Sequence, residues 1–234
     1  TETNFIVKMS KIKSLPLDVQ LLRIGLEYAR KRIKNEDVAS LFQNPDNGII
    51  SAQNYQNMHY FHAKVNENPP EIELKCGKAF QETLYCDVSL GNIIINKVEL
   101  EVEHLVDDVD KDVEAVKRIS GLSNFDMLDI VVPYAIADAL CDLEYHPKFH
   151  AEDIEAFGQK GAKNVEAFKQ KWLGPSQEHG LTAYRLGSPF RTCLEESKVT
   201  FDFECVVKGN EGFGTEFVYV TGDRKISKII GKRN

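Results

Sequence analysis

The N-terminal part of the chain carries apolar residues with the period of an α-helix. Ser14 is a typical capping residue, and Pro16 falls where the first helical turn would begin. The apolar residues that follow lie on one helical stripe: Leu17, Leu21, Leu22, Ile24, Leu26, Ala29 and Ile33. Residues 51–65 also repeat apolar positions at spacings of three and four, up to the stop at Pro69 and Pro70. We therefore predict one helix that begins near Ser14 and a second over residues 51–65.

Other stretches alternate apolar and polar residues with the period of a β-strand. Residues 80–90 and 98–102 alternate in this way, and Gly91 and Asn92 supply a turn between them. The last sixty residues alternate in the segments 198–207, 215–220 and 225–230, which are separated by turns containing glycine. The pattern predicts a long antiparallel hairpin and, at the C-terminus, an antiparallel meander.

The middle of the chain is assigned mainly to helices. An acidic segment, residues 107–120, reads as a helix that stops at Gly121, and a strand is predicted over 125–132. Further helices are predicted over 133–145, 151–157 and 163–173. The segments "IEAFGQK" and "VEAFKQK" recur eleven residues apart, so we expect two short helices with similar inner faces.

The predicted order, in which groups of helices alternate with groups of antiparallel strands, indicates an α+β fold with helices packed on antiparallel sheets. The order, helices then strands and again helices then strands, suggests two similar halves. We predict domains over 1–121, helices plus a hairpin, and 122–234, helices plus the meander, with a single domain as the alternative. This element order resembles that of the nuclear transport factor 2-like superfamily. The resemblance implies a helix pair that covers a curved sheet and encloses a cone-shaped cavity.

Composition and charge narrow the class of protein. With 234 residues, 42% hydrophobic and 28% charged, the chain can bury a substantial core. A net charge of −7 disfavours nucleic acid as a partner, and no apolar run approaches the length of a membrane span. The five cysteines are an odd number without dense spacing, and the N-terminus has no apolar signal core. We expect a cytoplasmic or nuclear protein with reduced thiols and a protein partner, and leave a homo-oligomer open.

The stretch "EYHPKFHAED" carries the most suggestive chemistry. His146 and His150 are four residues apart, and Cys141 lies upstream. Pro147 disfavours helical geometry at His146, so the two imidazoles cannot share one helix face. We predict a turn, with His150 near the start of the next helix; a metal site made by Cys141, His146 and His150 stays the alternative.

Other motifs fail when their spacing is examined. Asp108, Asp110 and Asp112 match the start of a calcium loop, but Val113 stands where the loop needs glycine and Ile119 where it needs glutamate. His59 and His62 have no third ligand nearby, and the glycines at 209, 212 and 214 read as a hairpin loop. No nucleophile elbow, phosphate-binding loop or zinc-protease helix occurs. We therefore assign no catalytic residue, cofactor or metal.

Without a catalytic constellation, the sequence favours a non-enzymatic intracellular protein-interaction module. The alternative is a small-molecule-binding or enzymatic cavity of the helix-on-curved-sheet type. The periods also predict a core of residues on the apolar faces of these elements: Leu21, Ile24, Leu84, Val88, Leu100, Val116, Leu140, Phe168, Phe201, Phe203 and Phe217.

Overall fold

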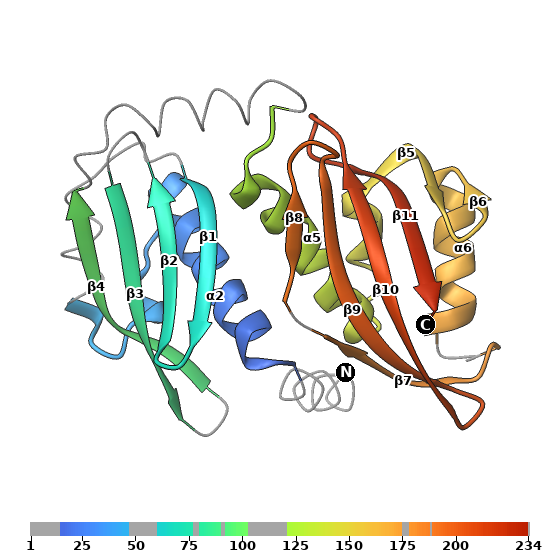
Figure 1. The fold of residues 1–234 in the computed structure, drawn as a ribbon, viewed down its shortest axis with the longest axis horizontal. Helices are drawn as coiled ribbons and strands as arrows, with labels where there is room; N and C mark the ends of the chain where they lie inside the picture. The colour runs from blue at the N-terminus through green and yellow to red at the C-terminus, as the bar shows by residue number, and fades with distance from the viewer. Residues whose placement is uncertain are drawn as a thin grey trace. The chain divides into compact units, whose positions relative to one another are not determined.

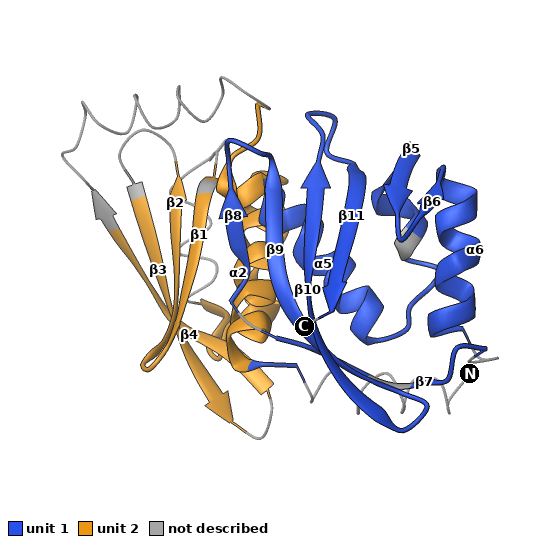
Figure 2. Cartoon of the chain, turned by 45° about the vertical axis from the view of Figure 1, so that its right-hand side comes forward, with its two compact units in different colours: residues 1–16, 127–234 blue, residues 17–126 orange. Residues whose placement is uncertain are grey.

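The computed structural model describes residues 15–46, 60–76, 80–89, 92–102, 121–174, 178–187 and 189–233. The fold is α+β, as predicted, with helices and largely antiparallel sheets (Figure 1). The chain divides into two compact units, residues 17–126 and residues 1–16 with 127–234 (Figure 2). The domain boundary that we place near Gly121 stays a prediction. No helix in the described part of the chain is long and apolar enough to cross a membrane.

The unit formed by residues 17–126 contains a helix and a four-stranded sheet. Helix α2 (Leu17–Ile33) and the 3-10 helix η1 (Ala39–Leu41) precede strands β1 (Tyr60–Glu67), β2 (Pro70–Cys76), β3 (Phe80–Ser89) and β4 (Asn92–Val102). The strands pair in sequence order, all antiparallel. Helix α2 contacts β1 and β2, so its apolar stripe packs on the sheet as the helical period predicts.

A charged cluster is buried within this unit. The Glu82 carboxylate accepts a hydrogen bond from Tyr60 Oη at 2.6 Å and lies 3.3 Å from the guanidinium of Arg32. Both charged side chains are almost fully buried. Because each charge has a partner, the cluster avoids most of the cost of burying an unpaired ion.

The other unit contains two helices and a seven-stranded sheet. It includes most of α5 (Asn124–Ala139), then the 3-10 helix η2 (His146–Phe149), β5 (His150–Ala156), β6 (Gln159–Lys160) and α6 (Ala162–Leu173). Strands β7 (Leu181–Leu186), β8 (Arg191–Cys193), β9 (Lys198–Val207), β10 (Asn210–Val220) and β11 (Ile226–Arg233) follow. The sheet order is β6-β5-β11-β10-β9-β7, with β8 also paired to β9. Among the described strands of this sheet, only β5 and β11 pair in parallel.

The predicted C-terminal meander is confirmed by β9, β10 and β11. The β9–β10 turn contains Lys208 and Gly209, both with positive φ, which suits a two-residue hairpin turn. The turn places Phe201 opposite Glu216 and Phe203 opposite Gly214. These residues therefore lie on the same face of the sheet, which we call the inner face.

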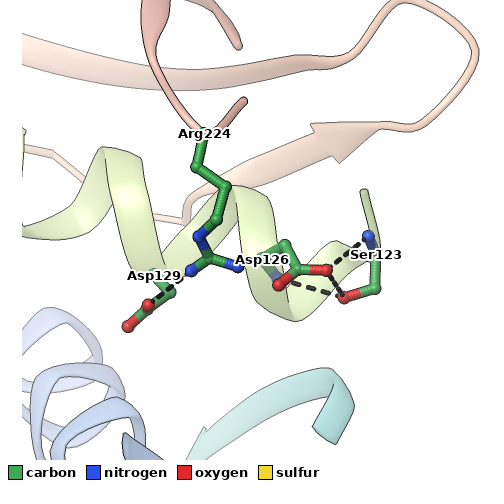
Figure 3. Close-up of polar contacts among 4 residues, drawn as sticks. All are labelled: Ser123, Asp126, Asp129 and Arg224. Carbon is green, nitrogen blue, oxygen red and sulfur yellow. Dashed lines mark hydrogen bonds and ion pairs between the residues drawn. The ribbon is translucent and has the colours of Figure 1, made fainter. Parts of the chain in front are cut away.

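The strand predicted over residues 125–132 is wrong, because these residues belong to helix α5. Ser123 precedes the helix, and Asp126 Oδ2 accepts hydrogen bonds from the Ser123 backbone N–H at 2.9 Å and hydroxyl at 2.8 Å (Figure 3). The Asp126 N–H in turn donates to Ser123 Oγ at 3.1 Å. This reciprocal pair is a capping box, which starts a helix regardless of the β-branched residues further along.

Within the unit of residues 127–234, α5 is also joined to the β10–β11 loop. Arg224 donates to Asp129 Oδ2 at 2.8 Å (Figure 3). The Asp129 side chain is mostly buried whereas that of Arg224 is largely exposed. The ion pair therefore fixes the loop to the helix without burying the guanidinium.

The helix predicted over residues 151–157 is also wrong, because this segment is strand β5. Ile154 and Ala156 are buried there at alternate positions, and pairing with β11 and β6 stabilises the strand despite its weak β-propensity. The two repeated segments thus adopt different structures, a strand and helix α6. Their inner residues still meet: the Phe157 and Phe168 rings stack at a centroid distance of 5.4 Å.

Residues 60–65 are strand β1, so the helix predicted over 51–65 is wrong in that part, and 51–59 lie outside the described residues. Several other predictions also lie outside the described residues: His59, the helix over 107–120, its acids Asp108, Asp110 and Asp112, and Val116.

Of the predicted core, Leu21, Ile24, Leu84 and Phe201 are buried. Val88 is 39% exposed because it lies near the end of β3, beyond a register shift. The other predicted core residues are half-buried: Leu100, Leu140, Phe168, Phe203 and Phe217.

Candidate functional site

A cavity of about 290 Å³ lies within the unit of residues 127–234, between α6 and the inner face of the sheet. Its walls are mainly aromatic and are formed by Phe157, Phe168, Trp172, Tyr184 and Phe203. The Tyr184 and Phe203 rings stack at 5.3 Å, and Phe168 stacks on Phe157. Aromatic side chains on two sides thus define an apolar space with flat walls.

Helix α6 supplies one wall through side chains at helical spacing. Val165, Phe168, Lys169 and Trp172 lie at positions i, i+3, i+4 and i+7, so they share one face of the helix. Val165 is fully buried, and the other three line the cavity. The helix lies beside β5 and β6, which it contacts (Figure 1).

Strands β9 and β10 supply the opposite wall. Phe203 and Cys205 of β9 line the cavity on the inner face, together with Glu216 of β10. On the outer face, the ring of Phe217 is half-buried and lies near Lys198 and Lys232. The hairpin register therefore turns a carboxylate toward the cavity and an aromatic ring away from it.

A buried ion pair lies at the cavity. Lys169 Nζ donates to Asp138 Oδ2 at 2.5 Å and to Tyr134 Oη at 2.6 Å. Lys169 is 4% exposed and Asp138 is 2% exposed. Tyr134 and Asp138 are four residues apart on α5, so both face the same lysine. Burial, reinforced by the charge of Asp138, raises the pKa of Tyr134 well above its usual value, so its hydroxyl keeps its proton.

Glu216 is the second buried acid of the cavity. It is 4% exposed; Oε1 accepts only a long hydrogen bond, 3.5 Å, from Tyr184 Oη. Oε2 is buried and accepts no hydrogen bond from the described residues. Burial, together with the charge of Asp138 and against the lowering influence of Lys169, raises the pKa of Glu216 to about 7. This carboxyl group can therefore give or take a proton near neutral pH.

Trp172 provides a second polar atom without a partner. Its Nε1 is buried and has no hydrogen-bond acceptor among the described residues. Its ring stacks on His179 at a centroid distance of 4.6 Å. Glu216 and Trp172, which both line the cavity, thus each carry a buried polar atom that has no hydrogen-bond partner among the described residues.

The residues of the "EYHPKFHAED" stretch lie elsewhere in this unit. His146 begins η2, which agrees with the predicted connector, and Cys141 follows α5 with a φ of 54°. His150 begins strand β5, not a helix as we predict from the sequence, and is buried beside the ring of Tyr134. Within the described ranges, no group of three or more His, Cys, Asp or Glu side chains is placed to hold a metal ion.

The sequence analysis missed both Glu216 and Lys169. A two-residue turn after Val207 pairs Phe201 with Glu216, so Phe201 and Phe217 cannot share a face of the sheet. Counting the register across that turn would have placed Glu216 on the inner face. Lys169 likewise stands on the apolar stripe of α6, where a charged residue indicates a buried partner.

No family model matches the sequence, and neither does any curated protein. Solved structures with some similarity include a steroid Δ-isomerase from Pseudomonas aeruginosa, with 14% identity, a TM-score of 0.41, and coverage of 47% of this chain and 80% of that one. An NTF2-like protein of unknown function from Cytophaga hutchinsonii has 10% identity, a TM-score of 0.37, and coverage of 46% and 89%. A protein with a cystatin-like fold from Methylobium petroleophilum has 13% identity, a TM-score of 0.40, and coverage of 48% and 78%. The function proposed below rests on the cavity residues alone.

Proposed function

We propose that residues 127–234 form a binding unit for a small, mainly apolar molecule, which occupies the aromatic-walled cavity. The observation that carries this proposal is the combination of a cavity of about 290 Å³ with a buried, partly unsatisfied carboxyl group at its wall. Ligand sites in proteins are typically apolar clefts with a few placed polar groups. This is the alternative that the sequence left beside a protein-interaction module.

The polar lining argues against a simple packing defect. A cavity that results only from imperfect packing has no reason to contain an ionisable group, and burying a carboxyl group without full hydrogen bonding is costly. Glu216 nevertheless lies at the cavity with Oε2 unpartnered among the described residues. Buried acids with strongly shifted pKa values concentrate at functional sites, which supports a ligand here.

The volume sets the size of the ligand. An apolar protein cavity of about 150 Å³ takes up benzene. The cavity here has about twice that volume, at 290 Å³, and its walls are flat rings. A molecule of roughly two fused rings therefore fits best.

The test uses prodan, a neutral naphthalene dye whose emission shifts to the blue in apolar surroundings. We expect the wild-type protein to bind it with one-to-one stoichiometry. Cys205→Phe, which fills the cavity, should abolish the shift, whereas Cys193→Phe should bind as the wild type does because Cys193 lies outside the cavity lining. No binding by the wild type, or equal binding by Cys205→Phe, would contradict the proposal.

A second candidate function is proton transfer to or from the bound molecule, and the pKa of Glu216 favours it. General acid–base catalysis is most effective when the pKa of the group lies near the working pH, and that of Glu216 is raised to about 7. The test is exchange of the α-protons of tetralone in deuterated buffer, followed by NMR. Glu216→Gln should lose the acceleration, and Glu204→Gln, on the exposed part of β9, should keep it. Exchange no faster than in buffer would exclude this second function.

A further inference from the structure

A cationic side chain, Arg233, lies at the open side of the cavity. Among the described residues that line the cavity, only Gly231 and Arg233 are exposed, and both belong to the last part of β11. We propose that the ligand is an amphipathic anion, whose apolar ring body occupies the cavity and whose carboxylate pairs with Arg233 at this opening. This inference rests on the proposed ligand-binding function and specifies the class of its ligand.

The register of the sheet places Arg233 on the cavity side. Arg233 is opposite Gly214 of β10, and Gly214 is opposite Phe203 of β9, without a register shift at these positions. The three residues therefore form one row across the inner face. A Cβ atom at Gly214 would lie 2.5 Å from the Phe203 ring, so this ring lies against the glycine. The aromatic wall of the cavity thus extends across β10 toward Arg233.

The guanidinium of Arg233 has no anionic partner among the described residues. The other cation that lines the cavity there, Lys169, is buried and donates to Asp138 and Tyr134. An anionic ligand would therefore find its cation at the opening and not in the interior. A guanidinium stays charged at any physiological pH and can bind a carboxylate through two parallel hydrogen bonds.

The buried acids set the orientation of such a ligand. Asp138 and Glu216 line the interior and are 2% and 4% exposed. A carboxylate placed beside them would meet the negative charge of Asp138 and would lose its hydration. At the opening, the same group keeps part of its hydration and meets a cation. The rings must therefore lie inside and the carboxylate outside.

A cationic ligand fits this distribution of charge poorly. Its charged group would meet Arg233 at the opening, and the ammonium of Lys169 if it entered the cavity. A neutral ligand of the same shape would gain nothing from Arg233. Probes that share one ring system and differ only in the charge of a short side chain therefore test the inference.

The probes are naphthylacetate, its neutral analogue naphthylacetamide, and the cationic naphthylethylammonium. Their dissociation constants are measured by equilibrium dialysis on the full chain at pH 7.5 and low ionic strength. We expect naphthylacetate to bind about threefold to fivefold more tightly than naphthylacetamide, and the ammonium probe to bind most weakly. In 0.5 M NaCl the preference for the anion should shrink to less than about twofold, because salt screens an exposed pair.

Variants of two neighbouring residues assign the effect to one side chain. Arg233→Gln should abolish the preference for naphthylacetate and leave the affinity for naphthylacetamide unchanged, and Arg233→Glu should favour the ammonium probe. Lys232→Gln and Lys232→Glu are the matched controls, because they change the charge equally at the next position of β11. Lys232 lies on the outer face, 5.2 Å from the centre of the Phe217 ring, and does not line the cavity. Both controls should keep the preference for the anion.

The outcomes separate the inference from the function on which it rests. If prodan binds but naphthylacetate and naphthylacetamide bind equally, the inference fails and the proposed function stands. A preference that persists in Arg233→Gln, or that Lys232→Gln removes to the same extent, would also overturn the inference. If neither prodan nor any naphthyl probe binds, both fail. Because Arg233 and Lys232 are exposed, all four variants should melt as the wild type does.

Discussion

Lys169 on α6 and Asp138 on α5 form an ion pair with Nζ and Oδ2 2.5 Å apart, buried beside the cavity. The two residues are 31 positions apart in the chain. Tyr134 accepts a second hydrogen bond from the same ammonium, so the lysine joins two helices through one buried charge. The integrity of the candidate site therefore depends on this pair.

Replacement of Lys169 with methionine should lower the free energy of unfolding by about 3–5 kcal/mol, because it leaves the charge of Asp138 in the interior without its ammonium partner. Urea denaturation measures the change. Lys171→Met, at an exposed position of the same helix, is the control and should change stability by less than about 0.5 kcal/mol.

The double variant Lys169→Met with Asp138→Leu tests the explanation. Removing both charges should recover much of the stability that the single substitution loses, since no unpaired ion remains. A double variant as unstable as the sum of both single variants would show that the two side chains do not interact.

Glu216 should make stability depend on pH. Its pKa rises from 4.5 to about 7 on folding, so the folded state binds the proton more tightly than the unfolded state. The stabilising contribution of the protonated form is complete below pH 4.5 and is lost as the pH rises through 7. Relative to Glu216→Gln, the wild type should lose roughly 3 kcal/mol between pH 4.5 and 8. Parallel pH dependences of the two proteins in urea melts would contradict this.

Two tyrosine–glutamate hydrogen bonds in the unit of residues 17–126 offer a matched comparison. Tyr60 donates to buried Glu82 at 2.6 Å, and Tyr85 donates to the more exposed Glu99 at 2.8 Å. Tyr60→Phe should cost about 1.5–3 kcal/mol, because it weakens the solvation of a buried charge. Tyr85→Phe should cost clearly less, because water screens the exposed Glu99. Equal losses in thermal or urea unfolding would mean that burial does not set the strength of these bonds.

Phe201 and Phe203 lie on the same face of β9 but differ in surroundings. Phe201 is fully buried, whereas Phe203 lines the cavity. Phe201→Ala should cost about 3–5 kcal/mol, and Phe203→Ala at least 1 kcal/mol less, because Phe203 already adjoins empty space. The order of the two values in urea denaturation tests this difference in surroundings.

The metal alternative for Cys141, His146 and His150 is tested directly with zinc. We expect metal analysis of protein purified without a histidine tag to find none bound, and thermal melts to be the same with zinc and with chelator. Bound metal would instead stabilise the fold by roughly 2.7 kcal/mol at a hundred times its dissociation constant. Stoichiometric zinc that disappears in His150→Ala would establish the metal site.

The sequence by itself determined the elements whose period is local and unambiguous. Helices α2 and α6 and the strands β9, β10 and β11 follow from the spacing of their apolar residues, because one buried face imposes that spacing. The α+β class follows from the same patterns. Mixed segments failed: the first half of α5, residues 125–132, is predicted as a strand because of its β-branched residues, although the Ser123–Asp126 capping box starts a helix.

Only the tertiary structure decided β5 and the candidate site. The segment at 150–156 becomes a strand because β11 and β6 pair with it, and those contacts are distant in sequence. Glu216 acquires its raised pKa from burial among residues of α5, α6 and β7, and Lys169 finds Asp138 on another helix. The local period of apolar residues indicates which face of a helix or strand is buried. The electrostatics of a site depend on which of these buried faces contact one another, and those contacts are set by tertiary packing.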